Sequence, residues 1–202
     1  MYKLLITVSF IGFIVLLLNT VFKSSPEEMI TLYGDINPLK SQPRQSPPRT
    51  AKAFERDGFI ITPLADFEIS ARVLGRENYY LGKESSLSPL DLTLGWGRMS
   101  DPEILEQISI RQSSRWYYWS TSSFPIPRRE IETHSANMHM IPANEHIEDL
   151  LDDVDEGRSI YLKGQLVRVD ADNGWRWVSS LSREDTGARA CELVYVTDVV
   201  MQ

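Results

Sequence analysis

The sequence predicts an N-terminal transmembrane helix followed by a β-rich α+β domain, and a small, partly open, OB-like barrel is the first choice for that domain. Three observations lead to this fold class. The chain has a long uncharged segment near its start, then a proline-rich stretch, and then short segments in which apolar and polar residues alternate. These segments divide the chain into a transmembrane anchor (1–25), a linker (26–53) and one globular domain (54–202). An irregular α+β sandwich is the second choice for the domain.

Residues 4–22 form the predicted anchor. This segment, LLITVSFIGFIVLLLNTVF, contains no charged residue, and Lys3 and Lys23 flank it. As a helix it would be about 28 Å long, close to the thickness of the hydrocarbon core of a bilayer. A cleaved signal peptide is the alternative, but its apolar region is usually shorter and ends in small residues, whereas this one ends in NTVFK.

The position of the apolar segment also predicts a topology. Only a short tail precedes the helix, so we expect the N-terminus in the cytoplasm and the domain outside it. The chain would then be a single-pass protein of the cell inner (plasma) membrane, with an extracytoplasmic C-terminal domain.

Residues 34–50, GDINPLKSQPRQSPPRT, contain four prolines and few apolar residues. Such a composition cannot form a core and favours an extended chain. We expect this segment to be a spacer between the membrane and the domain. A ligand for a proline-binding groove is the less favoured interpretation.

The composition excludes several classes of function. The chain has 42% hydrophobic residues, enough for a core, and a net charge of −7. An acidic surface repels phosphate groups, which disfavours sequence-independent binding of nucleic acids. The single cysteine, Cys191, excludes an intramolecular disulfide framework and any multi-cysteine metal centre.

Alternating apolar residues predict strands in the domain. The segment 67–73 alternates in this way, and a longer strand is expected over 159–169, where Gly164 marks a bulge or a sharp bend. Asp172-Asn173-Gly174 predicts a hairpin turn, because Asn-Gly tolerates positive φ angles. Further strands are expected at three places, namely 115–119, 175–177 and 193–196.

Two helices are expected. Ser100 and Glu103 have the spacing of a capping box, which predicts a short helix extending to Ile108. The clearest helix begins at Asn144, where apolar residues recur with helical spacing on one face and acidic residues occupy the other. Gly157 suits the end of that helix.

All three histidines lie in the segment HSANMHMIPANEH, residues 134–146. His134, Asn137 and His139 are the candidate catalytic residues for a hydrolase or a metal-dependent enzyme. The first two histidines are five residues apart, so neither a helix nor a strand places them on one face. An HExxH motif is absent. Structural polar contacts are therefore the favoured interpretation, and no metal site or cofactor is predicted.

A second set of candidates is suited to ligand binding. Trp175 and Trp177 are expected on one face of a strand, with Arg176 between them, and such indoles can stack on sugars or bases. Arg183 lies in the polar segment SSLSREDTG (179–187), which is suited to binding an anion or a sugar. Filling of a barrel core or rim by the indoles, and local hydrogen bonds in the polar loop, are the favoured interpretations.

Three stretches carry a resemblance to a group of proteins: HSANMHMIPAN (134–144), WRW (175–177) and SSLSREDTGARACE (179–192). In them the sequence resembles uncharacterised bacterial proteins with an N-terminal membrane anchor. The resemblance implies a bacterial membrane-tethered protein. It implies no activity, so no functional residue is carried over from it.

The leading hypothesis is a non-enzymatic single-pass membrane protein whose soluble domain contacts other envelope components, such as an envelope protein. The first alternative is a membrane-tethered enzyme, which requires His134, Asn137 and His139 to converge. The second alternative is an OB-like binder of oligosaccharides or single strands, which requires exposed indoles beside Arg176 in a groove.

Overall fold

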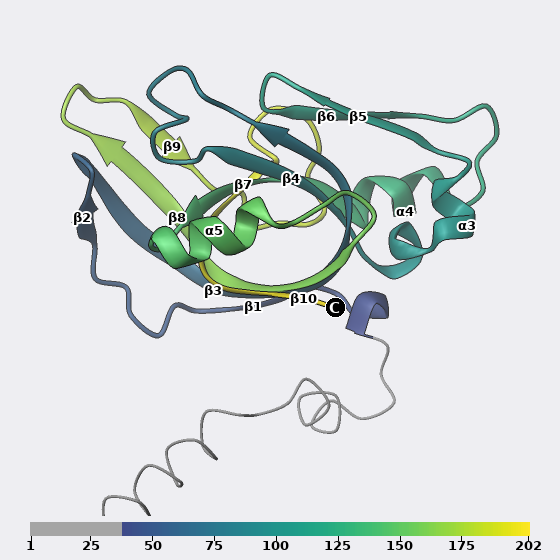
Figure 1. Ribbon diagram of the computed structural model, residues 1–202, viewed down its shortest axis with the longest axis horizontal. Helices are drawn as coiled ribbons and strands as arrows, with labels where there is room; N and C mark the ends of the chain where they lie inside the picture. Colours follow the sequence, from purple (N-terminus) through teal and green to yellow (C-terminus); the bar gives the residue numbers. More distant parts are fainter. Residues whose placement is uncertain (1–37) are drawn as a thin grey trace, which may run out of the picture. The chain divides into compact units, whose positions relative to one another are not determined.

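The computed structural model describes residues 38–202 (Figure 1). The predicted anchor and the first part of the predicted linker lie outside these residues. No helix within 38–202 combines the length and the apolar character needed to cross a membrane. The described residues form a β-rich domain, as the sequence predicts.

The domain contains one large sheet, one small sheet and five short helices. The strands of the large sheet are β1 (Arg44–Ser46), β2 (Phe54–Arg56), β3 (Phe59–Asn78), β4 (Leu90–Gly95), β7 (Ser135–Pro142), β8 (Ser159–Ala171), β9 (Arg176–Val178) and β10 (Glu192–Met201). The small sheet is the hairpin of β5 (Ser109–Ser113) and β6 (Trp116–Ser120). The helices are η1 (Pro38–Lys40), η2 (Gly97–Ser100), α3 (Pro102–Leu105), α4 (Arg128–Thr133) and α5 (Glu145–Asp152).

Five strands of the large sheet each pair with two others of the same set. β3 is antiparallel to β4 and to β8, β4 is antiparallel to β7, and β10 is antiparallel to β8. The remaining pair, β7 with β10, is parallel. The outer strands β1, β2 and β9 each have one neighbour, so the eight-stranded sheet as a whole stays open at its edges.

β3 is long and curved enough to pair with both β8 and β4. Residues 59–72 pair with β8, and residues 72–78 pair with β4. The register shifts between Pro63 and Ala65 and again between Val73 and Gly75, and such irregularities bend a strand. The expectation of a strand over 67–73 is confirmed, but the strand is much longer than that alternating segment.

Gly164 lies at the predicted irregularity of β8, because the register with β10 shifts between Val196 and Asp198, whose partners are Gly164 and Lys163. A Cβ atom on this residue would lie 2.2 Å from the main-chain oxygen of Tyr195. The glycine therefore permits a close approach of β8 to β10.

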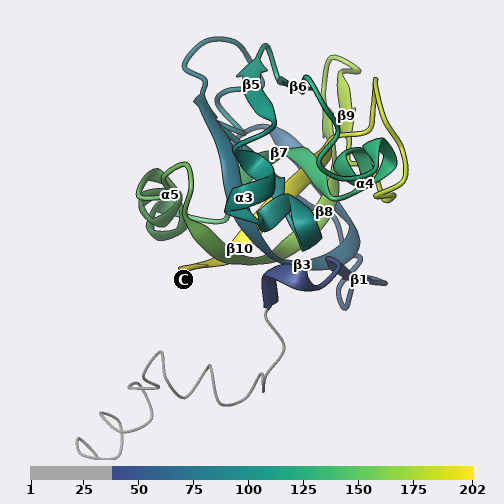
Figure 2. The same cartoon turned by 90° about the vertical axis from the view of Figure 1, so that its right-hand side faces the viewer.

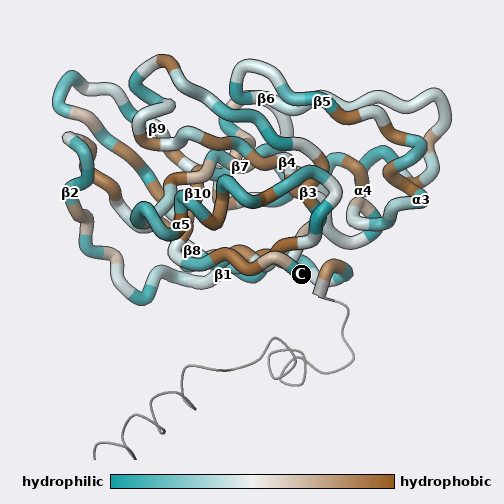
Figure 3. The backbone as a smooth tube through the Cα atoms, in the orientation of Figure 1, coloured by the Kyte–Doolittle hydropathy of each residue, from teal (hydrophilic) through white to brown (hydrophobic). Residues whose placement is uncertain are grey.

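The main core lies between the five paired strands and α5. Alternate residues of β3, β4, β7, β8 and β10 point into it, including the fully buried Phe67, Leu92 and Met140. Apolar and polar residues accordingly alternate over 67–73 of β3, and the strands carry both kinds of residue in Figure 3. Ile147 and Leu151 of α5 pack against these side chains, so burial of one helix face fixes α5 on the core.

The predicted N-terminal caps of two helices, α5 and α3, can be compared with the structure. The Asn144 side chain accepts a hydrogen bond from the main-chain N–H of Ile147, so the predicted start of α5 is confirmed. The predicted capping box is wrong, because Asp101 caps α3 by accepting from the N–H of Glu103, while Ser100 bonds back to Gly97. α3 is only four residues long, with Pro102 at its start and Glu106 as its C-cap.

Part of the segment expected to be a spacer lies on the sheet. β1 pairs with β3 at Asp66–Glu68, beyond the point where the pairing of β3 with β4 stops. Arg49 forms an ion pair with Asp66 at 2.7 Å, and Lys40 lies 3.9 Å from Asp101. Residues 40–49 are thus held against the domain by main-chain pairing and by side-chain contacts.

Candidate functional site

The β5–β6 hairpin covers the outer face of β4 and β7. Its two loop residues, Ser114 and Arg115, have φ angles of 54° and 69°, as the tight turn of a two-residue hairpin requires. Arg115 places its guanidinium 2.6 Å from Asp91 of β4 and donates a second hydrogen bond to the main-chain oxygen of Ser88. Gln112 of β5 donates to Asn137 of β7. These contacts fix the hairpin on the sheet.

Asp91 is the centre of this buried polar cluster. Its side chain is fully buried, and three groups surround it: Arg115, the amide of Asn137 at 3.0 Å and Nδ1 of His139 at 2.9 Å. Asn137 and His139 share this partner because residues two apart on a strand point to the same face. The ring of Trp177 covers His139, with 4.7 Å between ring centroids. The cluster therefore joins strands and is sealed from solvent.

His134 lies apart from this cluster. It follows α4 as its C-cap, and its Nε2 is 2.7 Å from the side-chain nitrogen of Gln42, while the indole of Trp96 lies beside it. The structure thus brings Asn137 and His139 together but leaves His134 at another place. Among residues 38–202, no group of three or more His, Cys, Asp or Glu side chains has the arrangement of a metal site.

The Trp175–Trp177 segment packs against the domain. Trp175 contacts the ring of Phe59 edge-on, Trp177 contacts His139, and the two indoles are 6.0 Å apart. Both indoles are half-buried, whereas Arg176 is exposed and pairs with Asp170 at 2.5 Å. The indoles therefore cover the outside of the sheet.

A cavity of about 630 Å³ lies beside the hairpin. One wall is the continuous segment 116–121, which is β6 and the residue after it; the floor includes 135–137 of β7 and part of α4. The opposite wall comes from the segment 182–192, the loop that leads into β10. In the turned view this loop, drawn in yellow, lies beside α4 (Figure 2).

Aromatic side chains dominate the hairpin side of the cavity. Trp116, Tyr118 and Phe124 all line it, and each is among the exposed large apolar side chains of the described residues. The sequence predicts a strand over 115–119, although it does not place the other walls of the cavity beside that strand. The unusual run of four aromatic residues, WYYW, is the signal that points to this wall.

The opposite wall contains a buried ion pair. Arg183 Nε lies 2.7 Å from Glu192 Oε1, and Glu192 is 1% exposed. Burial raises the pKa of Glu192 to about 7, although the charge of Arg183 acts in the other direction. Within residues 38–202, Arg183 Nη1 and Glu192 Oε2 have no hydrogen-bond partner. Arg183 was a ligand-binding candidate with local pairing as the favoured interpretation, and it both pairs with Glu192 and lines the cavity.

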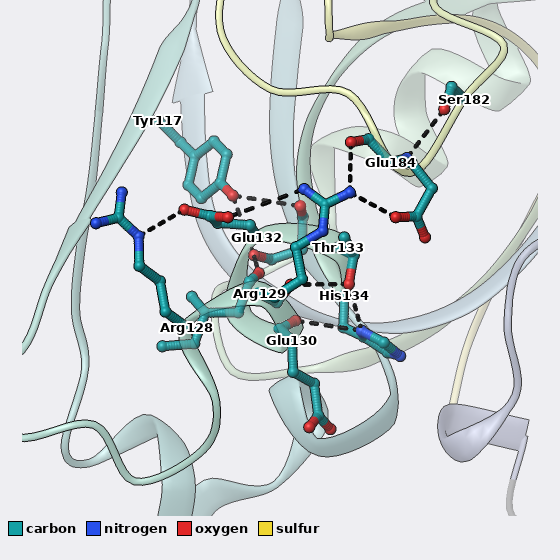
Figure 4. A network of polar contacts seen from close by, with 11 residues as sticks. Tyr117, Arg128, Arg129, Glu130, Glu132, Thr133, His134, Ser182 and Glu184 are labelled. Carbon is teal, nitrogen blue, oxygen red and sulfur yellow. Dashed lines mark hydrogen bonds and ion pairs between the residues drawn. The ribbon is translucent and has the colours of Figure 1, made fainter.

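A network of polar contacts holds the loop against α4 (Figure 4). Arg129 of α4 donates to the main-chain oxygen of Glu184 at 2.7 Å and pairs with its carboxylate. In the same network, the Tyr117 hydroxyl lies 3.0 Å from Ser135 Oγ, and Arg128 pairs with Glu132 within α4 at 2.8 Å. The three walls of the cavity are therefore linked to one another.

The thiol of Cys191, in the cavity wall, is unreactive. Burial, together with the charge of the neighbouring Glu192, raises the pKa of Cys191 to about 12. The neutral thiol is a poor nucleophile, because the thiolate is the reactive form. The cavity is thus lined by aromatic rings, paired charges and a protonated thiol.

Comparison of the chain with protein families, with curated proteins and with solved structures finds no match. The geometry of the domain is therefore the basis for the function proposed below.

Proposed function

We propose that this chain is a bacterial envelope protein, anchored in the inner membrane by residues 4–22, whose OB-like domain binds another envelope component in the cavity beside β6. The role is binding and not catalysis. The observation that carries the proposal is the position of the cavity, where the loop before β10 meets β6 and β7.

The order of the paired strands supports an OB-like assignment. The order β3, β4, β7, β10, β8 has one parallel pair, and α5 lies between β7 and β8 in the chain. In OB folds, ligands bind on the second and third strands, between the loop after the first strand and the loop before the last. The corresponding parts here are β4 and β7, with the segments 79–89 and 172–191.

The hairpin inserted between β4 and β7 changes the usual binding face. It covers Asp91, Asn137 and His139, and it leaves the cavity as the open part of that face. Exposed aromatic residues on a protein surface mark interaction sites, and the cavity volume is within the usual range for ligand pockets. These features favour binding at the cavity.

The chemistry of the candidates favours binding over catalysis. Asp91 and His139 are covered by the hairpin and by Trp177, so a substrate has no access to them. Cys191 is held in its neutral form by burial. The Arg183–Glu192 pair is suited to recognising a polar group in an otherwise aromatic pocket.

Site-specific photo-crosslinking in living cells tests the proposal. The full-length protein would carry a photoreactive phenylalanine analogue at Tyr118, or at Val200 of β10 as a matched exposed control. We expect a discrete adduct with an envelope component from position 118 and none from position 200. Equal adducts from both positions, or none from position 118, would contradict a role for the cavity in binding.

A further inference from the structure

The free edge of β6 is the most informative feature of the cavity. Within residues 38–202, β6 pairs with β5 and with no other strand. All its residues from Trp116 to Ser120 line the cavity, as expected when a strand edge, with its main chain, borders the space. An unpaired strand edge is a template for pairing with another chain.

The hairpin geometry determines which N–H and C=O groups of β6 are not bonded to β5 and are free to pair with another strand. In a two-residue hairpin, Ser113 and Trp116 flank the loop and form a hydrogen-bonded pair, and bonded pairs then alternate along the ladder. Tyr118 therefore also bonds to β5. The N–H and C=O groups of Tyr117 and Trp119 point to the outer edge, toward the cavity.

This edge lacks the features that usually prevent pairing. Natural edge strands are protected by charged residues, prolines, bulges or a covering segment. β6 reads WYYWS, has no charge or proline, and pairs with β5 in regular register over all five residues. A cavity in place of a covering segment lies along it.

The opposite wall offers a donor and an acceptor as well. Arg183 Nη1 and Glu192 Oε2 are buried without partners among residues 38–202, a costly arrangement unless another group satisfies them. An extended peptide displays N–H and C=O groups along both of its edges. It is therefore the kind of occupant that satisfies both walls at once.

We propose, building on the proposed binding function, that the cavity takes an extended peptide segment of a partner protein, which adds to β6 as a third strand of the β5–β6 sheet. The main chain of the segment pairs with Tyr117 and Trp119. Its outer main-chain edge faces the Arg183–Glu192 wall, and its side chains alternate between the two faces of the sheet, beside the aromatic rings of β6. Recognition by strand addition draws affinity from the main chain and specificity from such side-chain contacts.

An N-methyl scan tests strand addition directly. Full-length protein in phospholipid nanodiscs would be applied to an array of seven-residue peptides, in which Val or Thr alternates with every residue type in turn. Retained peptides would then be remade with one N-methylated amide at each position. We expect losses of roughly tenfold at every second position, the value of about one hydrogen bond, and small changes at the positions between.

A pair of exposed tyrosines provides matched variants. Tyr118→Ala removes a ring from the cavity wall, whereas Tyr80→Ala removes an exposed ring outside it. We expect the first to weaken peptide retention at least several-fold and the second to leave it unchanged, with equal tryptophan fluorescence confirming that both variants are folded.

Three results would overturn the inference: no retained peptide, N-methyl losses without a two-residue period, or retention of glycan oligomers in place of peptides. Each of them leaves the proposed binding function intact if position 118 still crosslinks in cells. Loss of that crosslink contradicts the binding function itself, so the two failures are distinguishable.

Discussion

Asp91 and His139 face each other across neighbouring strands, with Oδ1 2.9 Å from Nδ1 and both side chains buried. The register sets this relationship, because the two residues are direct partners in the β4–β7 ladder. A carboxylate beside an imidazole also occurs in catalytic sites. Here Arg115 and Asn137 occupy the rest of the carboxylate, so the group serves to fasten the β5–β6 hairpin.

Loss of the Asp91 carboxylate should therefore destabilise the domain. Asp91→Ala leaves the guanidinium of Arg115 without its buried counter-charge, which costs about 3 kcal/mol or more in the free energy of unfolding. Urea unfolding of the full-length protein in detergent, followed by tryptophan fluorescence, measures the effect, because all five tryptophans lie in the domain.

Asp152→Ala is the matched control for this prediction. Asp152 pairs with Arg76 at 3.3 Å but is mostly exposed, so its removal should cost less than about 1 kcal/mol. Equal destabilisation by the two variants would show that the Asp91 cluster does not hold the hairpin.

Gly164→Ala should disrupt the contact between β8 and β10. The added Cβ would lie 2.2 Å from the main-chain oxygen of Tyr195, a distance that forces the strands apart. We expect a loss of about 1–3 kcal/mol in the free energy of unfolding, as for other overpacked sites. Lys163→Ala, at the adjacent half-exposed position of β8, should change stability by less than about 1 kcal/mol. Similar values for both would refute the close-approach argument.

The anchor and its topology are tested by fractionation and a reporter. We expect the full-length protein in the membrane fraction, and we expect deletion of residues 1–25 to release it. An alkaline phosphatase fused after Gln202, which is active outside the cytoplasm, should be active in the full-length fusion. Recovery of the intact full-length protein in the aqueous fraction would contradict the anchor.

Local patterns predicted those parts of the fold that depend on neighbouring residues. The alternation in β3, the cap at Asn144 and the turn at Gly174, with its φ of 82°, are all encoded within a few residues. The capping box failed because Asp101 and Ser100 are both good caps, and the local chain path decides between them.

The candidate site was less predictable, because distant segments form it. The cavity combines β6, β7 and the loop before β10, and no short pattern encodes their approach. Glu192 was not singled out, since its burial depends on the packing of Arg183 against it. His134 was grouped with His139 because they are close in sequence, yet the end of α4 separates their environments.

The buried Glu192 should make stability depend on pH. Its pKa is raised from 4.5 to about 7, so the folded state binds more protons than the unfolded state between these values. Stability should thus be highest near pH 4.5–5 in this window and fall as the pH rises through about 7, by at most about 3 kcal/mol. The pKa values of Asp66, Glu130 and Asp170 are lowered, so these carboxylates change the free energy of unfolding only at pH values below this window.

Urea midpoints at pH 5, 6, 7 and 8 measure how stability depends on pH. Glu192→Gln should flatten this dependence, whereas Glu148→Gln on the exposed face of α5 should leave it unchanged. A slope unchanged in Glu192→Gln would assign the pH dependence to another group.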